Sequence, residues 1–478
     1  MIHSNQLKNQ HLLWRAAFGP MVENANELNN TSSQDLYRLL LKTSSKTPEN
    51  FNVASNLFDG LVKGIKDAVQ LENLSKEQKQ MIRKQSTDDL KNLNLRWLKE
   101  MINSEAQLRE KTSLFWHGHF ACRVINIYFQ QQLLDIIRKN ALGNFGDMLR
   151  EVSKSPAMLS FLNNQQNKKQ HPNENFAREV MELFTMGRGN YSETDIKEAA
   201  RAFTGWGFNI HGEFVDRPFQ HDNSSKTFLG KTGNFNGDDI IDILLEQKQT
   251  AKFITSKIYR YFVNEEADMA RVEMLSARFY QSGYSIKNLL EDTYTSDWFY
   301  DKKNIGTKIK SPVELLVGIR RLLPMEIENE QAQLLFQRAL GQILFYPPNV
   351  AGWPGGKSWI DSSSLMFRLS IPHLLTNASE FLMKPKDDDD TMMGMKSADD
   401  STVKGRKINT KVEWHTVIKV FESTSKINLA ESIASLMLQT QSKVSINILD
   451  KYTDKDSREN YIKTTIVELM STPEYQLC

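Results

Sequence analysis

The chain has 478 residues, and its 60 basic and 58 acidic side chains leave a net charge of +2 at pH 7. This balance, without a basic stripe interleaved with aromatic residues, gives no bulk attraction for nucleic acid or an anionic membrane, so we expect neither partner. The two cysteines, Cys122 and Cys478, are too few for a disulfide framework.

The first twenty residues lack both the apolar core of about 7–15 residues and the small-residue cleavage pattern of a signal peptide. No run of about 18 apolar residues occurs in the sequence, which therefore predicts no membrane span. From these two features we expect a cytoplasmic protein.

Helical periodicity dominates the chain and predicts a mainly α fold. Before residue 105 the apolar spacing predicts helices over His11 to Phe18, Leu36 to Leu41, Ala54 to Val69, Lys76 to Arg83 and Asp88 to Met101. Later helices are expected over Asp238 to Leu245, Thr250 to Phe262 and Val313 to Leu323. Ser311-Pro312 is a clear start signal for the last of these, a cap followed by proline in the first turn.

Two histidines mark the end of the next predicted helix, which runs from Glu105 to Trp116. The sequence there is Phe-Trp-His-Gly-His-Phe, and Gly118 favours a helix end. If the backbone is extended at this point, His117 and His119 place both imidazoles on one side, as metal ligands would be. The alternative is that one histidine caps the helix end while the other packs among the aromatic neighbours.

Residues 171–206, HPNENFAREVMELFTMGRGNYSETDIKEAARAFTGW, predict two helices joined by a glycine-rich turn. Asn173 is the expected N-cap of the first helix, because Pro172 disfavours helix before it. Ser192 and Asp195 resemble a capping box that opens the second helix. One face of the first helix is apolar, with Phe176, Val180, Leu183 and Phe184.

The opposite face of that helix carries Asn175, Glu179 and Glu182 within about 60° of one another, at about 100° per residue. Two carboxylates so close repel each other unless a cation or a proton lies between them. One interpretation is therefore that they project into a crevice and hold a cation. The other is a solvated face stabilised by ion pairs with Arg178 at i,i+4 spacing.

A short β-hairpin is predicted after Trp206, with Phe208 to Ile210 paired to Glu213 to Val215. His221 and Asp222 follow in a loop, where such a pair can supply a metal ligand or an acid–base group. The more ordinary explanation is a turn, since aspartate favours turns through its own backbone contacts.

Residues 345–360, FYPPNVAGWPGGKSWI, predict a fixed irregular loop rich in proline and glycine and anchored by two tryptophans; we call it the tryptophan loop. Residues 384–411 are acidic and polar, which predicts a disordered linker. These features divide the chain into a main helical body over 1–383, the linker insertion, and a C-terminal helical segment over 412–478 that packs back on the body.

Seven motifs occur in an order that resembles a large bacterial family, domain of unknown function 1800. They are HLLWRAAFGP, FWHGHF, NENFAREVMELFTMG, ARAFTGW, HD followed by KTFLG, KSPVELLVG and PPNVAGWPGG. The resemblance runs from His11 to the terminal STPEYQL and leaves only the linker unmatched. It implies no established activity.

The resemblance carries three further expectations. Many members have histidine where this chain has Phe184, so a metal site that used that histidine would be altered here. Many members are exported, whereas no export signal is evident here. Many are also encoded beside a protein that resembles sulfatases and phosphatases, which implies such a protein as a partner.

Two functions follow as hypotheses. The first is a metal-dependent enzyme, a hydrolase or an oxidoreductase, with one divalent cation such as Zn²⁺, Mn²⁺ or Fe²⁺. Its metal ligands would be His117, His119, Glu179, Glu182 and His221, and its catalytic groups Glu179, Glu182 and Asp222. The second is a non-catalytic accessory or binding protein that works with the sulfatase- or phosphatase-like partner. No P-loop, dinucleotide fingerprint or nucleophile elbow occurs in the sequence.

Overall fold

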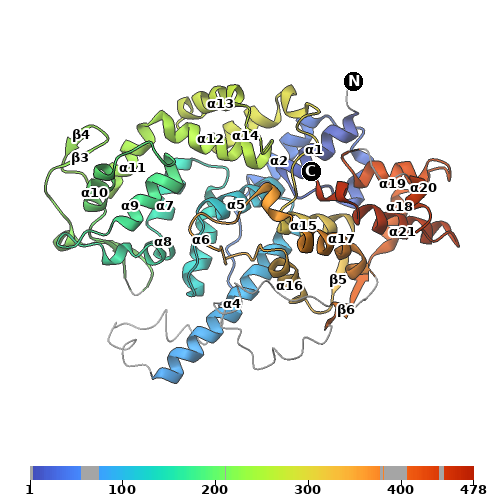
Figure 1. Cartoon of the computed structure of the whole chain (residues 1–478), viewed down its shortest axis with the longest axis horizontal. Coiled ribbons are helices and arrows are strands. Elements are labelled where there is room, and N and C mark those ends of the chain that lie inside the picture. Colours follow the sequence, from blue (N-terminus) through green and yellow to red (C-terminus); the bar gives the residue numbers. More distant parts are fainter. Residues whose placement is uncertain (1–3, 55–74, 210, 377–379, 382–405, 441–445) are drawn as a thin grey trace.

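Helices make up most of the computed structural model, which describes residues 4–54, 75–209, 211–376, 380–381, 406–440 and 446–478. The mainly α fold that the sequence predicts is therefore confirmed (Figure 1). The helices of the first half are α1 (Asn5–Ala16), α2 (Ser33–Ser44), α4 (Lys76–Asn103), α5 (Gln107–His119), α6 (Ile127–Asn140), α7 (Phe145–Ser153), α8 (Pro156–Phe161), α9 (Glu174–Glu179) and α10 (Glu193–Ala202). Those of the second half are α11 (Gly237–Glu246), α12 (Lys248–Phe262), α13 (Met269–Gln281), α14 (Ile286–Tyr294), α15 (Pro312–Leu322), α16 (Ala332–Ala339), α17 (Ser362–Thr376), α18 (Trp414–Val420), α19 (Leu429–Met437), α20 (Ile446–Leu449) and α21 (Arg458–Met470).

Strands in the described residues are short and pair two by two. The pairs are β1 (Trp206–Phe208) with β2 (Phe214–Asp216), β3 (Lys226–Phe228) with β4 (Lys231–Gly233), β5 (Met325–Ile327) with β8 (Thr410–Val412), and β6 (Glu380–Phe381) with β7 (Arg406–Lys407). The first pair is the predicted hairpin, and Phe208 lies opposite Phe214 in it. The β5–β8 pair joins segments far apart in the sequence, which local patterns cannot predict.

Helix starts follow the predicted caps. The side chain of Asn173 accepts a hydrogen bond from the backbone of Asn175, and Ser192 forms a complete capping box with Asp195. Ser311 forms another with Glu314 at the start of α15. Each such cap stabilises its helix by about 1 kcal/mol, because it satisfies backbone N–H groups that have no partner within the helix.

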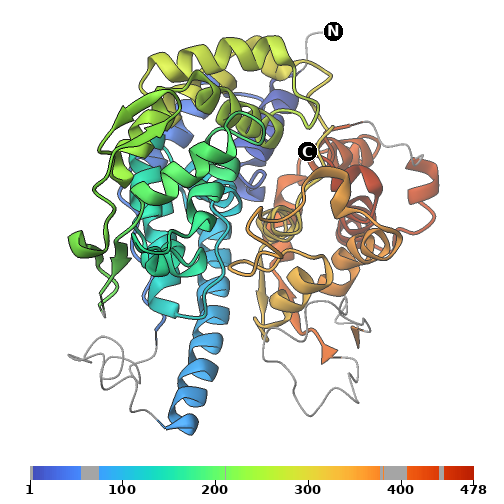
Figure 2. The ribbon, with the colours of Figure 1, turned by 60° about the vertical axis from the view of Figure 1, so that its left-hand side comes forward.

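Helix lengths differ from the prediction in two places. The segments expected over 76–83 and 88–101 form one continuous helix of 28 residues, α4, which extends below the body in Figure 1 and Figure 2. Helix α5 continues through Gly118 to His119, where the glycine was expected to favour a helix end. The helix expected over Ala54 to Val69 lies almost wholly outside the described residues.

The apolar core runs from α1 to α21 in one continuous cluster. A second cluster surrounds Trp97 of α4, where Phe18, Leu114, Val317 and Phe345 meet it. Each large side chain buried in this way contributes about 1.5–3 kcal/mol relative to its exposed state. The second cluster therefore fixes the start of the tryptophan loop against α4, α5 and α15.

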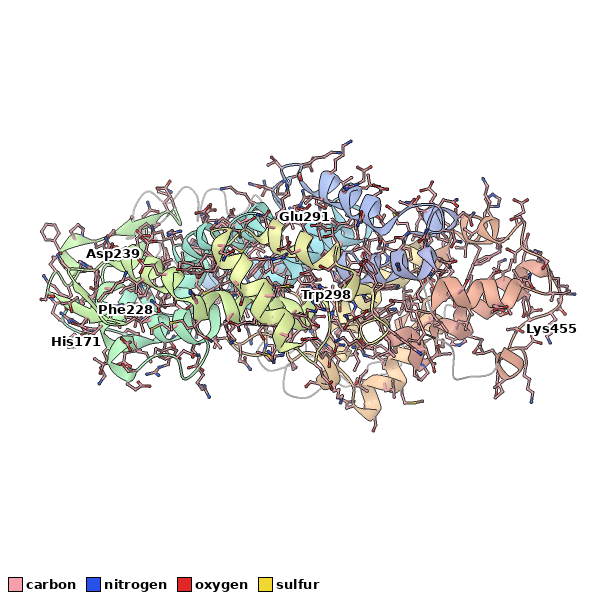
Figure 3. The ribbon with its side chains drawn as sticks, turned by 90° about the horizontal axis from the view of Figure 1, so that it is seen from above. His171, Phe228, Asp239, Glu291, Trp298 and Lys455 are labelled. Carbon is pink, nitrogen blue, oxygen red and sulfur yellow. The ribbon has the colours of Figure 1, made fainter. Side chains whose placement is uncertain are left out.

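Helix α21 near the C-terminus packs against α17. The side chain of Gln10 on α1 donates to the backbone oxygens of Ser435 at 2.8 Å and Leu436 at 3.1 Å. Figure 3 shows an elongated molecule, with His171 and Phe228 at one end and Lys455 of the C-terminal segment at the other.

Most of the expected linker, residues 382–405, lies outside the described residues. Its last part does not fit the prediction, because residues 406–411 contain β7 and most of β8. The backbone pairing of β8 with β5 supplies hydrogen bonds that the polar composition of this stretch does not reveal. Among the described helices, none is both long and apolar enough to cross a membrane.

A buried ion network joins α5, α15 and the segment before α15. The Glu314 carboxylate accepts hydrogen bonds from Lys111 on α5 and from Lys308 at 3.0 Å. As part of the capping box it also accepts one from the backbone N–H of Ser311 at 2.7 Å. Lys111 and Glu314 are each 1% exposed, so water cannot solvate either charge. Burial would raise the pKa of Glu314, but the two lysines hold it well below its ordinary value.

We expect Glu314→Gln to lower the free energy of unfolding by about 3–5 kcal/mol, because it leaves two buried ammonium groups without a counter-charge. Urea unfolding measures this. The matched control is Glu266→Gln at an exposed carboxylate, which should change stability by less than about 0.5 kcal/mol. Equal stabilities of the two variants would show that the network does not hold the body together.

Candidate functional site

His117 and His119 do not form the extended pair that the sequence suggests. Both belong to the last turn of α5, where residues two apart point about 200° away from each other. The two imidazoles therefore face different parts of the structure. The helix continues through Gly118 because its last turn is held by packing on both sides, and glycine is tolerated near a helix end.

His117 anchors the tryptophan loop. Its Nε2 atom accepts a hydrogen bond from the backbone N–H of Phe345 at 3.1 Å, and its ring lies 5.1 Å from Trp97 and 5.3 Å from Trp353. Burial lowers the pKa of His117 to about 3, so the ring is neutral and can accept that bond. This is the packed arrangement that the FWHGHF motif leaves open as the alternative to a metal ligand.

His119 faces the helix of the NENFAREVMELFTMG motif. Its Nε2 atom lies 3.2 Å from the carbonyl oxygen of Phe184, to which it donates, and its ring lies 6.0 Å from the Phe184 ring. Its Nδ1 atom is buried and has no hydrogen-bond partner among the described residues. Burial, and then the charge of Lys257, hold the pKa of His119 well below its ordinary value, so the ring is neutral.

Glu179 and Glu182 lie on that same helix, which continues as a π-turn over Val180–Thr185. The Glu182 carboxylate accepts hydrogen bonds from Arg188 Nε at 2.9 Å and from the Tyr191 hydroxyl at 3.1 Å. Glu179 is half-buried, and burial together with the charge of Glu182 raises its pKa. Glu182 is therefore held by protein groups on its own stretch of the chain.

His221 and Asp222 lie in a third place, against the end of α10. Arg201 donates to the Asp222 carboxylate at 2.7 Å, and His221 Nδ1 lies 2.9 Å from the carbonyl oxygen of Thr204. Burial would raise the pKa of Asp222, but the hydrogen bond from Arg201 holds it well below its ordinary value. Asp222 therefore serves as an ion-pair partner of Arg201.

The predicted ligands thus divide among separate places. In the part of the chain that the structure describes, no group of three or more His, Cys, Asp or Glu side chains could hold a metal ion. The structure brings His119 to a cavity, as described next, and leaves the other five predicted side chains outside its lining.

A cavity of about 400 Å³ lies at the end of α5. Its walls are the last turn of α5, the last turns of α12, residues 308–314 and the tryptophan loop. Ligand pockets in proteins commonly have volumes of about 300–1,000 Å³ and a mostly apolar lining with a few polar groups. This cavity has both properties, since Phe115, Tyr261, Trp353 and Trp359 line it beside several charged groups.

Three charged side chains of the lining come from α12 and the turn after it. Lys257 Nζ donates to the carbonyl oxygen of Leu183 at 3.5 Å, a long contact, and burial lowers the pKa of Lys257 to about 8. Arg260 follows one turn later. Glu265 has a buried Oε1 atom without a hydrogen-bond partner among the described residues. Within those residues no salt bridge joins any of these three to another side chain.

The cavity floor is the buried network of Glu314 and Lys308. Lys308 Nζ also lies 4.4 Å above the ring of Tyr261, in a cation–π contact. The Tyr261 hydroxyl is buried without a hydrogen-bond partner among the described residues. A buried hydroxyl of this kind can bind a ligand or an ordered water, and among the atoms in this state the hydroxyl of Tyr261 is one whose residue lines the cavity.

Glycines shape the cavity. Gly352 has φ of +85°, and a Cβ there would overlap the backbone oxygen of Gly118. Gly356 has φ of +59°, and a Cβ there would overlap the carboxylate of Glu265. A Cβ on Gly118 would meet nothing within 4 Å, although alanine is a better helix former than glycine. The glycine at 118 therefore leaves open space where a side chain would fit.

Sequence reasoning missed Lys257, Glu265, Lys308 and Glu314. One signal was present: Lys257 lies at the edge of the apolar stripe formed by Ile254 and its neighbours on α12, where a lysine is unusual. The capping-box position of Glu314 was a second signal, since it fixes the carboxylate at the start of an apolar helix. Nothing local indicates that these residues meet His119.

The fold and the cavity define a helical protein whose mostly apolar cavity, with a few charged groups, is built in part from three of its sequence motifs, FWHGHF, KSPVELLVG and PPNVAGWPGG. The family model described as "Protein of unknown function (DUF1800)" matches residues 11–477, and the chain belongs to this family. Searches of curated proteins and of solved structures return no match.

We expect Glu179→Gln to keep or raise the melting temperature at pH 7. The pKa of Glu179 is raised in the folded protein, so its ionised form costs stability above the unfolded pKa of about 4.3. That cost, and with it the advantage of the variant, should disappear as the pH falls to about 4. Melting curves over this pH range measure it. A lower melting temperature for the variant, with a matching loss in wild type on adding chelator, would instead indicate a cation at Glu179 and Glu182.

We expect Gly356→Ala to destabilise the protein by about 1–3 kcal/mol, since it strains a positive-φ position and displaces Glu265. The control is Gly355→Ala, because the neighbouring glycine has φ of −111° and a Cβ there meets nothing within 4 Å. Chemical unfolding compares the two. A control variant as unstable as Gly356→Ala would show that the loop tolerates no substitution here in general, and that the contact with Glu265 is not the cause of the lost stability.

Proposed function

We propose that this chain is an enzyme that binds a small organic molecule in the cavity and acts on it by proton transfer. One observation carries the proposal. Three residues of the lining, His119, Tyr261 and Glu265, have buried polar atoms that make no hydrogen bond within the part of the chain that the structure describes, so these residues are available to a ligand.

The chemistry of each group fits a role in proton transfer. Lys257, with a pKa lowered by burial to about 8, can give and take a proton near neutral pH. Neutral His119 has an Nδ1 lone pair that can accept a hydrogen bond from a bound molecule. The carboxylate of Glu265 is a further acceptor. A bound molecule that packs against the aromatic walls would displace water from them, which strengthens its interaction with these groups.

Two other proposals have less support. A Zn²⁺, Mn²⁺ or Fe²⁺ ion held by the five predicted ligands would need His117 and Glu182 to leave the partners described above. Elemental analysis of the purified protein tests for such an ion. A non-catalytic role beside a sulfatase- or phosphatase-like partner rests on the family resemblance, and copurification with that partner tests it.

The cavity proposal is tested with Gly118→Leu. Leucine in a helix should keep or raise the melting temperature, because it replaces glycine with a better helix former, and its side chain should fill the open space. A panel of small organic acids, amines and alcohols is screened by thermal shift, and each hit is followed by NMR for chemical conversion. We expect hits and conversion with wild type and their loss in Gly118→Leu.

Gly118→Ala is the matched control, since it adds only one methyl group at the same position. Its affinity for any hit should lie between those of wild type and Gly118→Leu. A panel without hits, or hits that Gly118→Leu binds as well as wild type does, would overturn the proposal that the cavity is the functional site.

A further inference from the structure

The cavity presents unpaired charges of both signs. Lys257 and Arg260 are one turn apart on α12 and so lie on the same side of that helix. Glu265 follows the end of the helix, and its carboxylate lies under Gly356 of the tryptophan loop. Among the described residues these three form no ion pair with one another, although all three line the same cavity.

The remaining charges of the lining are already matched. Lys308 donates to both oxygens of Glu314, at 3.0 and 3.3 Å, so this pair offers no free charge to a ligand. The lining therefore offers a ligand two cations on α12, Lys257 and Arg260, and one anion after the end of that helix, Glu265. A ligand that complements the charges of both signs must itself carry an anion and a cation.

The surfaces around these charges are apolar. Phe115 and Tyr261 lie 5.2 Å apart between ring centres, and Trp353 and Trp359 come from the loop. Aromatic walls favour a ligand with an apolar body, which they remove from water. Glu265 Oε1 is itself buried, so a cation beside it would not compete with solvent.

We propose that the ligand of this cavity is a small zwitterion, an amino acid with an apolar side chain. Its carboxylate lies against Lys257 and Arg260, its ammonium group against Glu265, and its side chain against the aromatic walls. This inference rests on the proposed function, because it names the class of molecule that the same cavity takes.

The test compares three molecules that differ in one charged group. L-Phenylalanine carries both groups, 3-phenylpropanoate lacks the ammonium, and 2-phenylethylamine lacks the carboxylate; L-leucine with its corresponding acid and amine forms a second set. Calorimetric titration of wild type should give an affinity for the zwitterion about tenfold or more above that of either half, because charged hydrogen bonds in buried sites contribute that much.

Two variants assign each end. In Glu265→Gln, phenylalanine and 3-phenylpropanoate should bind with similar affinity, since the preference for the ammonium is lost. In Lys257→Met, phenylalanine and 2-phenylethylamine should bind with more similar affinities than they do in wild type, since part of the preference for the carboxylate is lost. Both variants remove a partly buried unpaired charge, so we expect them to fold, which melting curves verify. Lys252→Met on the same helix, where the lysine pairs at the surface with Glu273, is the control and should bind as wild type does.

The outcomes separate this inference from the proposed function. If one of the half-molecules binds as tightly as the zwitterion and Gly118→Leu abolishes the binding of both, the assignment of the ligand as a zwitterion is wrong. The proposal that the cavity is the functional site then stands. If no molecule of either set binds, the zwitterion is overturned, and the broader panel screened against Gly118→Leu decides whether the cavity binds anything. If the Glu265 and Lys257 variants keep the wild-type preference, the assigned ends are wrong.

Discussion

The Glu314 carboxylate is the interaction on which the rest of this structure depends. It caps α15, neutralises Lys111 on α5 and holds Lys308, whose ammonium group lies over the ring of Tyr261. A buried carboxylate with one partner would cost stability, but two cations and a backbone N–H offset its removal from water. The same side chain therefore fixes two helices and forms the floor of the cavity between them.

The walls of the cavity follow from that fixed floor. Helix α5 ends at the cavity, and its two histidines have different contacts. His117 binds the backbone of the tryptophan loop, while His119 lines the cavity. Gly352 lets the loop approach the backbone of Gly118 closely. A rigid frame of this kind can hold unpaired charged groups apart. In a flexible loop the same groups could move together and form an ion pair.

Local features of the fold were predictable because local interactions produce them. Caps at Asn173, Ser192 and Ser311 and the hairpin after Trp206 depend on residues a few positions apart. The pairing of β5 with β8 joins residues more than eighty positions apart, and no local pattern encodes it. The helix through Gly118 was mispredicted for a related reason, since packing from distant segments outweighs the low helix propensity of glycine.

The site was only partly predictable. Of the residues that the sequence singled out for chemistry, His119 lies at the cavity, and the tryptophan loop, predicted as a fixed irregular loop, forms one of the cavity walls. Glu179 and Glu182 share a helix face as their spacing predicts, but azimuth on one helix does not reveal which neighbour covers that face. The contacts that bring Lys257 and Glu265 to the cavity come from segments far away in sequence, such as Leu183 and Gly356, which no local pattern reveals.

A high-resolution crystal structure of the protein as purified tests the central claim most directly, since it shows what lies between Lys257 and Glu265. The account predicts an open cavity with ordered density for a small molecule or water between the two side chains, which remain too far apart to pair. A cavity closed by the tryptophan loop, with Lys257 and Glu265 in a direct salt bridge, would contradict it and make these residues part of the structural core.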